Sequence, residues 1–336
     1  MSSAHEFAIG IIGTGQVVRT VHLPVLLGLP GVRVAWVADA DAARAAKVAC
    51  AYRVRAINLP ANLRELPAAD VVLLAVPFGI RGPYYAALAD KVCAVYAEKP
   101  FARSLRQHRA IAALFPEYAL GVGFQRRSSA QAEVARGCIH NCPFGAMKRI
   151  RFGLGGPGIV VGGRYSQSLK LAGGGILMET GVHGLDLALF VTSATGVEVV
   201  EANMVLDQGI DVHTRAQLRM ETPLGAVPFE LTVTALEESI ERFEMIFEHA
   251  TIAFSLFSPE PPRVLCGSRS YLLTETNSYP AAPFEIFREY WITFLAGLTE
   301  RSPNMSSASA SILTTEALEK LYANASAVEV DELCTR

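Results

Sequence analysis

Short apolar runs alternate with helix-compatible stretches over the first third of the chain. The first run, Phe7 to Ile12, ends at a glycine turn, and a helix-compatible stretch follows as far as Leu27. The run at 71–76 is apolar throughout, which is typical of a strand buried on both faces. Further strands are expected at 32–38, 93–97 and 119–124, and helices at 42–52, 84–89 and 104–115. This alternation predicts a parallel, doubly wound sheet, and hence an α/β domain over residues 1–124.

The pattern changes beyond residue 124. Glycine is dense over 153–175, which predicts a long irregular segment. Strand-like runs then follow one another without intervening helices, at 197–206, 214–221, 227–235, 243–247 and 251–257. Such runs favour an antiparallel or mixed sheet, and helices are expected after it at 284–298 and 307–321. Residues 125–336 are therefore predicted to form a second, α+β domain.

The composition narrows the range of partners. The chain has 336 residues, 51% of them hydrophobic, and a formal net charge of −2. That length accommodates two domains, and the weak charge gives no electrostatic reason to expect nucleic acid or a membrane surface as a partner. No apolar run reaches the roughly 20 residues of a membrane helix, and Met1 to Glu6 does not resemble a secretory signal, so a cytoplasmic protein is expected. Cys138 and Cys142 flank His140 without a second ligand pair, so reduced thiols are favoured over a metal site.

A candidate dinucleotide site begins at Gly13 and Gly15, where the first strand passes into the first helix. Glycine there lets backbone amides approach a pyrophosphate, although a plain strand-to-helix turn could also use it. Gln16 and Val17 follow directly and are predicted cofactor contacts. Asp39 ends the second strand, where a carboxylate can accept hydrogen bonds from the ribose hydroxyls and repel a 2′-phosphate. NAD is therefore favoured over NADP.

Two neighbours of Asp39 bear on that preference. Asp41 strengthens the negative field, whereas Arg44 weakens the inference because its guanidinium could reach a phosphate. Asp39 could also serve as the N-cap of the following helix, and both roles are compatible.

A lysine, an imidazole and two carboxylates supply candidate acid–base chemistry. Lys99 lies just past an apolar run, where a strand would end. Glu179 and His183 are four residues apart and Asp186 is three further on, so the three share one face of a helix. These side chains could converge on one substrate oxygen. Each also has a structural alternative: Lys99 as a surface partner of Glu98, His183 as an interior histidine, and Asp186 as a helix anchor.

Seven short motifs are spread over nearly the whole chain. They are Gly13-Thr14-Gly15, His22-Leu23-Pro24, Asp39-Ala40-Asp41, Glu98-Lys99-Pro100, Gly123-Phe124-Gln125-Arg126-Arg127, the triple glycine at 173–175, and Gly181-x-His183-x-x-Asp186. Together they resemble the Gfo/Idh/MocA family of NAD(P)-dependent oxidoreductases. The combination of Glu-Lys-Pro with a downstream Gly-x-His-x-x-Asp is fairly specific to that family.

The resemblance implies an N-terminal Rossmann domain and a C-terminal domain whose open, mostly antiparallel sheet often forms the oligomer interface, so a homodimer or homotetramer is expected. Pro77, Glu98 and Lys99 would add cofactor contacts. Typical substrates are sugars, cyclitols and their nucleotide-linked forms. Lys99 would hydrogen-bond the oxygen that changes between hydroxyl and carbonyl, and His183 would relay its proton. Glu179 would orient His183 or contact a neighbouring hydroxyl.

The sequence departs from the family pattern at three positions. Val18 replaces the third small residue of the glycine fingerprint, and Glu179 replaces a shorter aspartate. Arg81 stands where many members carry a histidine. Because arginine cannot act as a base at neutral pH, Arg81 is expected to bind an anion of the substrate or to form a structural ion pair.

Further substrate contacts are expected from other polar residues. Arg126 and Arg127 could bind a charged substrate group or hold a hinge between the domains. Arg164 and Tyr165, inside the glycine-rich segment, are candidate substrate contacts, as is Asp186.

The predicted function is hydride transfer between a nicotinamide dinucleotide and a hydroxyl or ketone of a sugar-like substrate. Two alternatives stay open. A lyase or glycosidase-type enzyme could use a tightly held NAD for transient oxidation, and a non-catalytic dinucleotide-sensing regulator could use the same fold. The presence of Lys99, Glu179 and His183 argues against a sensor, because a sensor does not need a proton-transfer set.

Overall fold

The computed structural model describes residues 6–91, 94–156, 169–236, 240–258, 260–273 and 283–330. The chain divides into two units. The first comprises Met1–Phe101, Arg106–Gly123 and Phe284–Ser311, and the second comprises Ala102–Leu105, Phe124–Pro283 and Ile312–Arg336. The predicted division at residue 124 is therefore corrected for Phe284–Ser311, which belong to the first unit.

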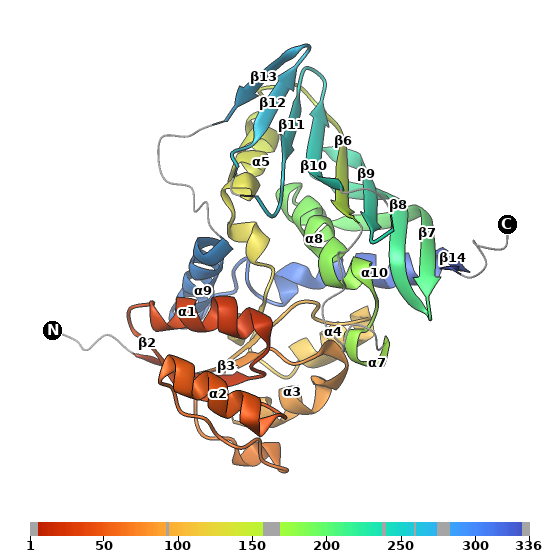
Figure 1. The fold of residues 1–336 in the computed structure, drawn as a ribbon. Helices are drawn as coiled ribbons and strands as arrows, with labels where there is room; N and C mark the ends of the chain where they lie inside the picture. The colour runs from red at the N-terminus through yellow and green to blue at the C-terminus, as the bar shows by residue number, and fades with distance from the viewer. Residues whose placement is uncertain are drawn as a thin grey trace. The chain divides into compact units, whose positions relative to one another are not determined.

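The sheet of the first unit is parallel, with the strand order β2-β1-β3-β4-β5. Its strands are β1 (Phe7–Ile12), β2 (Val32–Ala38), β3 (Val71–Leu74), β4 (Ala94–Ala97) and β5 (Leu120–Val122). The helices that alternate with them are α1 (Leu23–Leu27), α2 (Ala42–Tyr52), α3 (Gly82–Ala89) and α4 (Leu105–Ala112) (Figure 1). Every residue of β3 and β4 is buried, as continuous apolar runs require. The predicted doubly wound α/β fold is confirmed.

The order of these strands marks one edge of the sheet as the place for a ligand. Strand β1 lies between β2 and β3, so the chain crosses from one side of β1 to the other after β2. Where the strand order reverses in this way, ligands of open α/β sheets bind outside the carboxyl ends of the strands. The residues that follow β1 and β3 therefore flank the expected ligand position.

Helix α9 (Pro283–Glu300) belongs to the first unit because its aromatic stripe packs on the parallel sheet. The ring of Trp291 stacks on Tyr96 of β4 with 4.3 Å between the ring centroids. The hydroxyl of Tyr290 donates a hydrogen bond to the carbonyl of Val122 in β5 at 2.7 Å. Periodicity predicted this helix and its apolar stripe, but it does not say which sheet the stripe covers.

The second unit contains a mixed sheet with the order β13-β12-β11-β10-β6-β9-β8-β7-β14 among the described residues. Its strands are β6 (Met147–Gly155), β7 (Gly196–Asp207), β8 (Ile210–Thr222), β9 (Gly225–Thr234), β10 (Ile240–Phe247), β11 (Thr251–Phe254), β12 (Arg263–Cys266), β13 (Arg269–Leu272) and β14 (Ser326–Glu329). Neighbours are antiparallel except β6 with β9 and β14 with β7. The predicted, mostly antiparallel sheet is confirmed. The predicted irregular segment is corrected at its start, because Gly153 and Gly155 are paired residues of strand β6.

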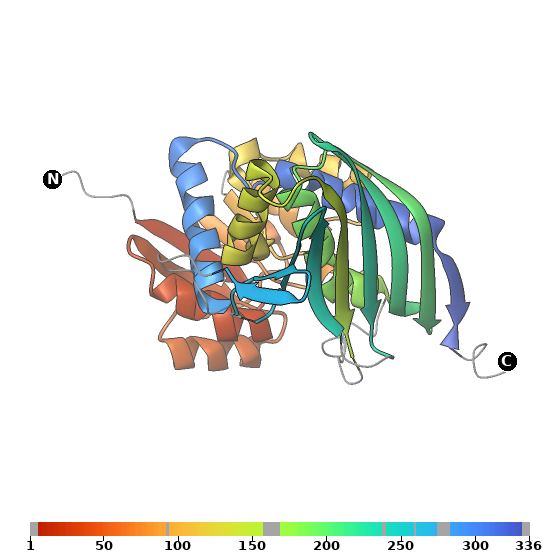
Figure 2. The same ribbon diagram turned by 90° about the horizontal axis from the view of Figure 1, so that it is seen from above.

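Helices of the same unit cover one face of this sheet. They are α8 (Val182–Val191) and α10 (Ile312–Asn324), with α5 (Ala130–Asn141) beside α8. In β6 the side chains of Ile150 and Phe152 are buried, whereas Arg149 and Arg151 alternate with them and lie on the opposite face. No described helix covers that opposite face (Figure 2).

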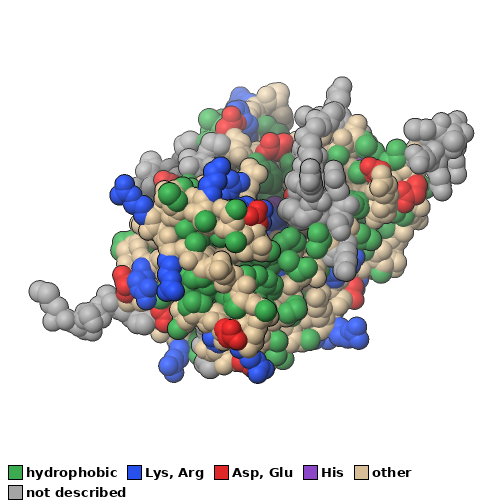
Figure 3. All heavy atoms as spheres, turned by 60° about the horizontal axis from the view of Figure 1, so that its bottom comes forward, with side chains coloured by type: hydrophobic (Ala, Val, Ile, Leu, Met, Phe, Trp, Pro, Cys, Tyr) green, Lys and Arg blue, Asp and Glu red, His purple; other side chains and the backbone are tan. Residues whose placement is uncertain are grey.

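The surface carries both signs of charge. In the view of Figure 3, Lys and Arg side chains are interspersed with Asp and Glu rather than gathered by sign. None of the described helices is long and apolar enough to cross a membrane.

Substitution of two helical glycines, one in α8 and one in α5, would show how tightly α8 packs on the sheet. A Cβ at Gly184 in α8 would lie 2.3 Å from the ring of Phe152, whereas one at Gly137 in α5 would meet nothing within 4 Å. We expect Gly184→Ala to lower the free energy of unfolding by about 1–3 kcal/mol through overpacking. Gly137→Ala should raise it by about 0.5–1 kcal/mol, because alanine favours the helix. Chemical denaturation measures both changes, and a stabilising Gly184→Ala would contradict the close packing.

Candidate functional site

The turn after β1 has the space and the backbone geometry that a pyrophosphate requires. Gly13 has a φ of +94°, and a Cβ there would lie 2.4 Å from the carbonyl oxygen of Ala75, just past β3. A Cβ at Gly15 would meet no described heavy atom within 4 Å, so this glycine faces open space. Val18, which departs from the glycine fingerprint, is fully buried, and its side chain is part of the hydrophobic core. The turn therefore fits a dinucleotide phosphate.

The residues predicted to bind the cofactor gather at one edge of the parallel sheet. Parallel strands end at the same edge, so residues far apart in the sequence meet there. They are Gly13 and Gly15 after β1, Asp39 after β2, Pro77 after β3, and Glu98 and Lys99 after β4. Gln16 is exposed and Val17 is half-buried, immediately before the π-helical turn Val18–His22.

Asp39 is a buried carboxylate whose acceptor sites are taken by protein donors. Thr14 donates its backbone N–H at 2.7 Å and its hydroxyl at 2.8 Å, and Asp41 donates its N–H at 2.9 Å. Arg44 forms a fork with the same carboxylate, with Nε at 3.1 Å and Nη2 at 2.5 Å. Burial raises the pKa of Asp39, but these hydrogen bonds outweigh burial and hold the pKa at about 2.

This arrangement corrects the basis of the predicted preference for NAD over NADP. The prediction relied on Asp39 accepting hydrogen bonds from the ribose and repelling a 2′-phosphate, and it already named Arg44 as the residue that weakens this inference. Arg44 instead neutralises that charge, and the arginine side chain is itself 47% exposed, so it is accessible to a ligand phosphate. Asp39 ties the turn after β1 to the end of β2, and its carboxylate alone does not discriminate between the two dinucleotides.

Arg81 holds the backbone on both sides of Lys99. Its Nε donates to the carbonyl of Val76 at 2.9 Å, and its Nη1 donates to the carbonyls of Glu98 and Pro100, the latter at 2.7 Å. The buried guanidinium thus joins the end of β3 to the end of β4. These donors serve main-chain carbonyls, which favours a structural role for Arg81 over the predicted substrate contact.

Glu98 is buried at the end of a hydrogen-bonded chain that starts on α9. Trp291 Nε1 donates to Nδ1 of His22 at 3.0 Å, and Nε2 of His22 lies 2.8 Å from Oε1 of Glu98. Because Nδ1 accepts a hydrogen bond, the ring proton of His22 is on Nε2, and this N–H donates a hydrogen bond to the Glu98 carboxylate. Burial raises the pKa of Glu98, but the hydrogen bond from His22 and the charges of Lys99 and Arg81 outweigh burial and keep it below its usual value. Glu98 is therefore an ionised, fixed neighbour of Lys99.

In the second unit, Glu179 and His183 lie on one continuous helical segment. A π-helical turn, Leu177–Gly181, runs directly into α8, whose second residue is His183. Glu179 is half-buried, whereas His183 is buried and meets the ring of Phe257 edge-on, with 6.0 Å between centroids. The expected helix is present, although its first turn is wider than an α-helical turn.

Asp211, which sequence reasoning missed, fixes the start of that segment. Its carboxylate accepts the N–H of Gly175 at 2.5 Å, the N–H of Leu177 at 2.8 Å and the hydroxyl of Tyr322 at 2.7 Å. A Cβ at Gly175 would lie 2.0 Å from the backbone oxygen of Asp211, and one at Gly174 would lie 2.3 Å from the hydroxyl of Tyr322. The glycines therefore let this segment dock closely on β8 and α10.

Asp186 and Arg127 form a buried ion pair. Arg127 donates Nε at 2.9 Å and Nη2 at 2.5 Å to the two carboxylate oxygens, and the hydroxyl of Thr314 donates at 2.7 Å. The carboxylate of Asp186 is engaged within the protein and anchors α8, which favours the helix-anchor alternative over the predicted substrate contact. Arg164 and Tyr165, also predicted as substrate contacts, lie outside the described residues.

Arg126 has no acidic partner among the described residues, unlike the adjacent Arg127. Its Cζ lies 4.5 Å from the centroid of the Phe257 ring. His183 meets the same ring, so two of the predicted site residues come together within the second unit. Lys99 belongs to the first unit.

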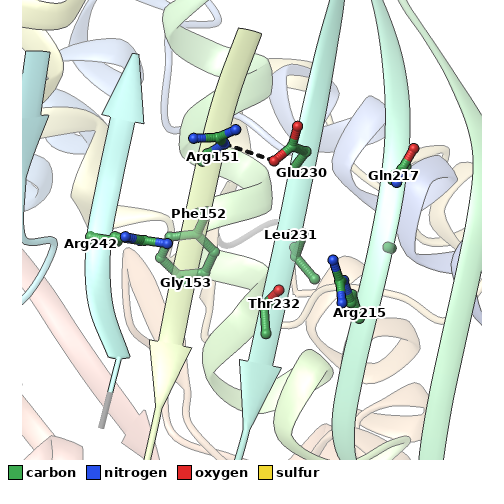
Figure 4. A pocket seen from close by; sticks show the side chains of 10 residues that line it. Arg151, Phe152, Gly153, Arg215, Gln217, Glu230, Leu231, Thr232 and Arg242 are labelled. Atoms are coloured by element: carbon green, nitrogen blue, oxygen red, sulfur yellow. Dashed lines mark hydrogen bonds and ion pairs between the residues drawn. The ribbon is translucent and has the colours of Figure 1, made fainter. Parts of the chain in front are cut away.

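A charged hollow of about 320 Å³ lies on the uncovered face of the second sheet (Figure 4). Arg151 pairs there with Glu230 at 2.8 Å, and Arg215 and Arg242 line the hollow from β8 and β10. None of the residues predicted to act in catalysis or cofactor binding lines this hollow. It is a feature of the sheet face, separate from those residues.

The buried Asp39 carboxylate makes a pH-dependent contribution to stability. Its pKa of about 2 in the folded protein lies below the ordinary 3.8, so folding favours the ionised form. The contribution, about 2 kcal/mol, is present above about pH 4 and is lost as the pH falls toward 2. Asp39→Asn should reduce the free energy of unfolding by that amount at pH 7, and by progressively less between about pH 4 and pH 2. Chemical denaturation at several pH values checks this, and a pH-independent difference would refute it.

Comparison with solved structures shows the same fold over nearly the whole chain. The 3-ketoreductase KijD10 of Actinomadura kijaniata, in complex with NADP and TDP-benzene, is 17% identical with a TM-score of 0.83, and the match covers 97% of this chain and 99% of that chain. A levoglucosan dehydrogenase in complex with NADH is 15% identical with a TM-score of 0.82, over 95% of this chain and 97% of that chain. Identities this low establish a likeness of fold.

A family model gives more specific information. Residues 7–124 match the Gfo/Idh/MocA model, which is described as an oxidoreductase family with an NAD-binding Rossmann fold. No curated protein matches the chain. The match covers the glycine turn, Asp39 and the Glu98-Lys99-Pro100 segment, and it confirms the resemblance seen in the sequence. Residues 7–124 therefore match the Gfo/Idh/MocA family of oxidoreductases.

Proposed function

We propose that the protein transfers hydride between a nicotinamide dinucleotide and a hydroxyl or ketone of a sugar-like substrate. The observation that carries this proposal is the setting of Lys99. It follows β4 at the same sheet edge as the Gly13–Gly15 turn, and Arg81 holds the carbonyls of the residues on either side of it. A lysine whose flanking backbone is held, at the sheet edge that carries the glycine turn, supports the stabilisation of negative charge on a substrate oxygen.

Lys99 would donate a hydrogen bond to the oxygen that changes between hydroxyl and carbonyl. As that oxygen loses its proton during oxidation, the ammonium group would stabilise the developing negative charge. The dinucleotide, when bound, supplies the hydride donor or acceptor, and the protein supplies alignment and electrostatics. Glu98, fixed by His22, places an opposite charge beside Lys99.

His183 would take the hydroxyl proton in oxidation and return it in reduction. An imidazole suits both directions, because its ordinary pKa of about 6.5 lies close to neutral pH. Glu179, four residues earlier, would orient His183 or bind a neighbouring substrate hydroxyl. Asp211 supports both residues by holding the first turn of their segment. The mechanism requires Lys99 and His183 to act on the same substrate oxygen.

The choice of dinucleotide depends in this proposal on Arg44. Its guanidinium is held beside Asp39 but remains about half exposed, so it can pair with a 2′-phosphate. One structural neighbour binds NADP and another binds NADH. We propose that this chain accepts both, with Arg44 as the residue that permits NADP.

We also propose that the protein forms a homodimer or homotetramer through the second sheet. The uncovered face carries Arg149 and Arg151 on β6 and Glu230 on β9, which already pair within the chain. A face with both signs of charge can pair with its own copy across a twofold axis.

Lys99→Met tests the catalytic role directly. We expect turnover on a panel of sugars and cyclitols to fall by about three orders of magnitude, while dinucleotide affinity changes little, because the charge on Lys99 acts mainly in the transition state. Turnover is followed by nicotinamide absorbance, and dinucleotide binding by calorimetry. Lys47→Met, at an exposed lysine on α2, is the matched control and should change neither quantity. Near-normal turnover in Lys99→Met would contradict the catalytic role of Lys99.

Arg44→Ala tests the choice of dinucleotide. The variant should lose about tenfold or more in affinity for NADP and much less for NAD, because only NADP carries the phosphate that the guanidinium would meet. Titration of both dinucleotides into the two proteins measures the ratio. Arg64→Ala, at an exposed ion pair with Asp90, is the control and should leave the ratio unchanged. An unchanged ratio in Arg44→Ala would exclude the proposed contact.

The same assays separate the two alternative functions. Cofactor that co-purifies and is not consumed during turnover would favour the lyase or glycosidase-type enzyme. Dinucleotide binding without turnover of any member of a broad sugar panel would favour the regulator.

A further inference from the structure

Two adjacent arginines on the 3₁₀ turn Gln125–Ser128 have opposite environments. Arg127 is neutralised by Asp186 in a two-pronged ion pair. Arg126 is only 8% exposed, yet it has no hydrogen-bond or ion-pair partner among the described residues, and its Nε is buried without an acceptor. Burial lowers the pKa of Arg126 to about 10, and the charge of Glu241 only partly opposes this. A buried guanidinium in this state is costly unless an anion joins it.

The residues around Arg126 hold its guanidinium and the neighbouring loop in a defined arrangement. Its guanidinium lies over the ring of Phe257, and the N–H of Phe257 donates to the carboxylate of Glu241 at 3.2 Å. Glu241 is thereby engaged with the loop and forms no ion pair with Arg126 within the described part of the chain. Gln131 of α5 donates to the carbonyl of Ser258 at 3.2 Å and holds the same loop from the other side. The stacked ring keeps the guanidinium in place without using any of its donors.

The same turn carries further unsatisfied polar atoms. Gln125 Oε1 and Ser128 Oγ are buried without a partner among the described residues. Buried polar atoms are ordinarily hydrogen-bonded, so three such atoms on one four-residue turn point to a ligand. The hydroxyls of a sugar would supply donors for Gln125 and Ser128, but they would not neutralise Arg126. His183, which meets the Phe257 ring, connects this turn with the proposed proton relay.

We propose that Arg126 binds an oxyanion of the substrate, a carboxylate or a phosphate, so that the protein acts on an acidic sugar derivative rather than on a neutral sugar. The planar fork of a guanidinium suits either oxyanion. Arg127 cannot serve in this way, because Asp186 occupies its fork. The identification of the anion as part of a reacting substrate rests on the proposed hydride transfer, whereas the binding of the anion does not.

Binding to the dinucleotide-loaded protein tests this proposal with matched probes. D-glucose is compared with D-glucuronate for the carboxylate, with D-glucose 6-phosphate for a terminal phosphate, and with UDP-glucose for a diphosphate. At least one acidic probe should bind the wild-type protein about 10- to 100-fold more tightly than D-glucose, because a charge-assisted pair is gained. The acid that shows this advantage identifies the class of anion.

Three variants locate the effect. Arg126→Met should abolish the advantage of the acidic probe over D-glucose, so the two probes should bind this variant with similar affinity. Arg126→Lys should keep part of the advantage, because lysine retains the charge but not the fork. Arg136→Met removes a comparable stack of an exposed arginine on Phe190 at 4.9 Å, and it should have no effect.

The possible outcomes separate this inference from the proposed function. The inference is overturned if no acidic probe binds better than D-glucose, or if Arg126→Met keeps the advantage. Selective binding of an acidic probe without any nicotinamide turnover would refute the hydride-transfer proposal and leave the anion site standing. Turnover of neutral sugars by the wild-type protein, with no acidic probe bound more tightly than D-glucose, would refute the anion site and leave the hydride-transfer proposal standing.

Discussion

Three hydrogen bonds from the buried guanidinium of Arg81 hold together the part of the structure on which the proposed chemistry depends. They join the carbonyls of Val76, Glu98 and Pro100, beyond the points where β3 and β4 end. A buried carbonyl without a donor costs free energy, so loss of the Arg81 guanidinium would destabilise the arrangement of the two chain segments. The position of Lys99 follows from this constraint.

Other buried charges in the protein serve the backbone in a similar way. Asp39 ties the glycine turn after β1 to the end of β2, and Asp211 ties the triple glycine to β8. Each places one ionisable group where several backbone N–H groups would otherwise lack acceptors. Arg126 is different, because it is buried over an aromatic ring and serves no acceptor among the described residues. That contrast is the reason to regard Arg126 as a ligand-binding residue.

Sequence reasoning succeeded where the signal was local. The strands from Phe7–Ile12 to Leu120–Val122 follow from short apolar runs, and the glycine turn follows from its place between a strand and a helix. It failed where a side chain's partner is distant in the sequence. For Arg81 and Asp186 the sequence left a substrate contact and a structural role both open, and only their partners, up to 128 residues away, favour the structural role. Helix α9 was assigned to the wrong domain for the same reason.

The sequence by itself determined the parallel α/β fold, the dinucleotide turn, and the identities of Lys99, Glu179 and His183 as acid–base candidates. These features depend on residue type and on spacing within one element, which the chain records directly. Only the tertiary structure decided which charges are already neutralised. Arg44 and Arg127 have carboxylate partners, whereas Arg126 has none among the described residues. Pairing depends on which distant segments meet, and the energy of a buried charge is set by its partners rather than by its place in the sequence.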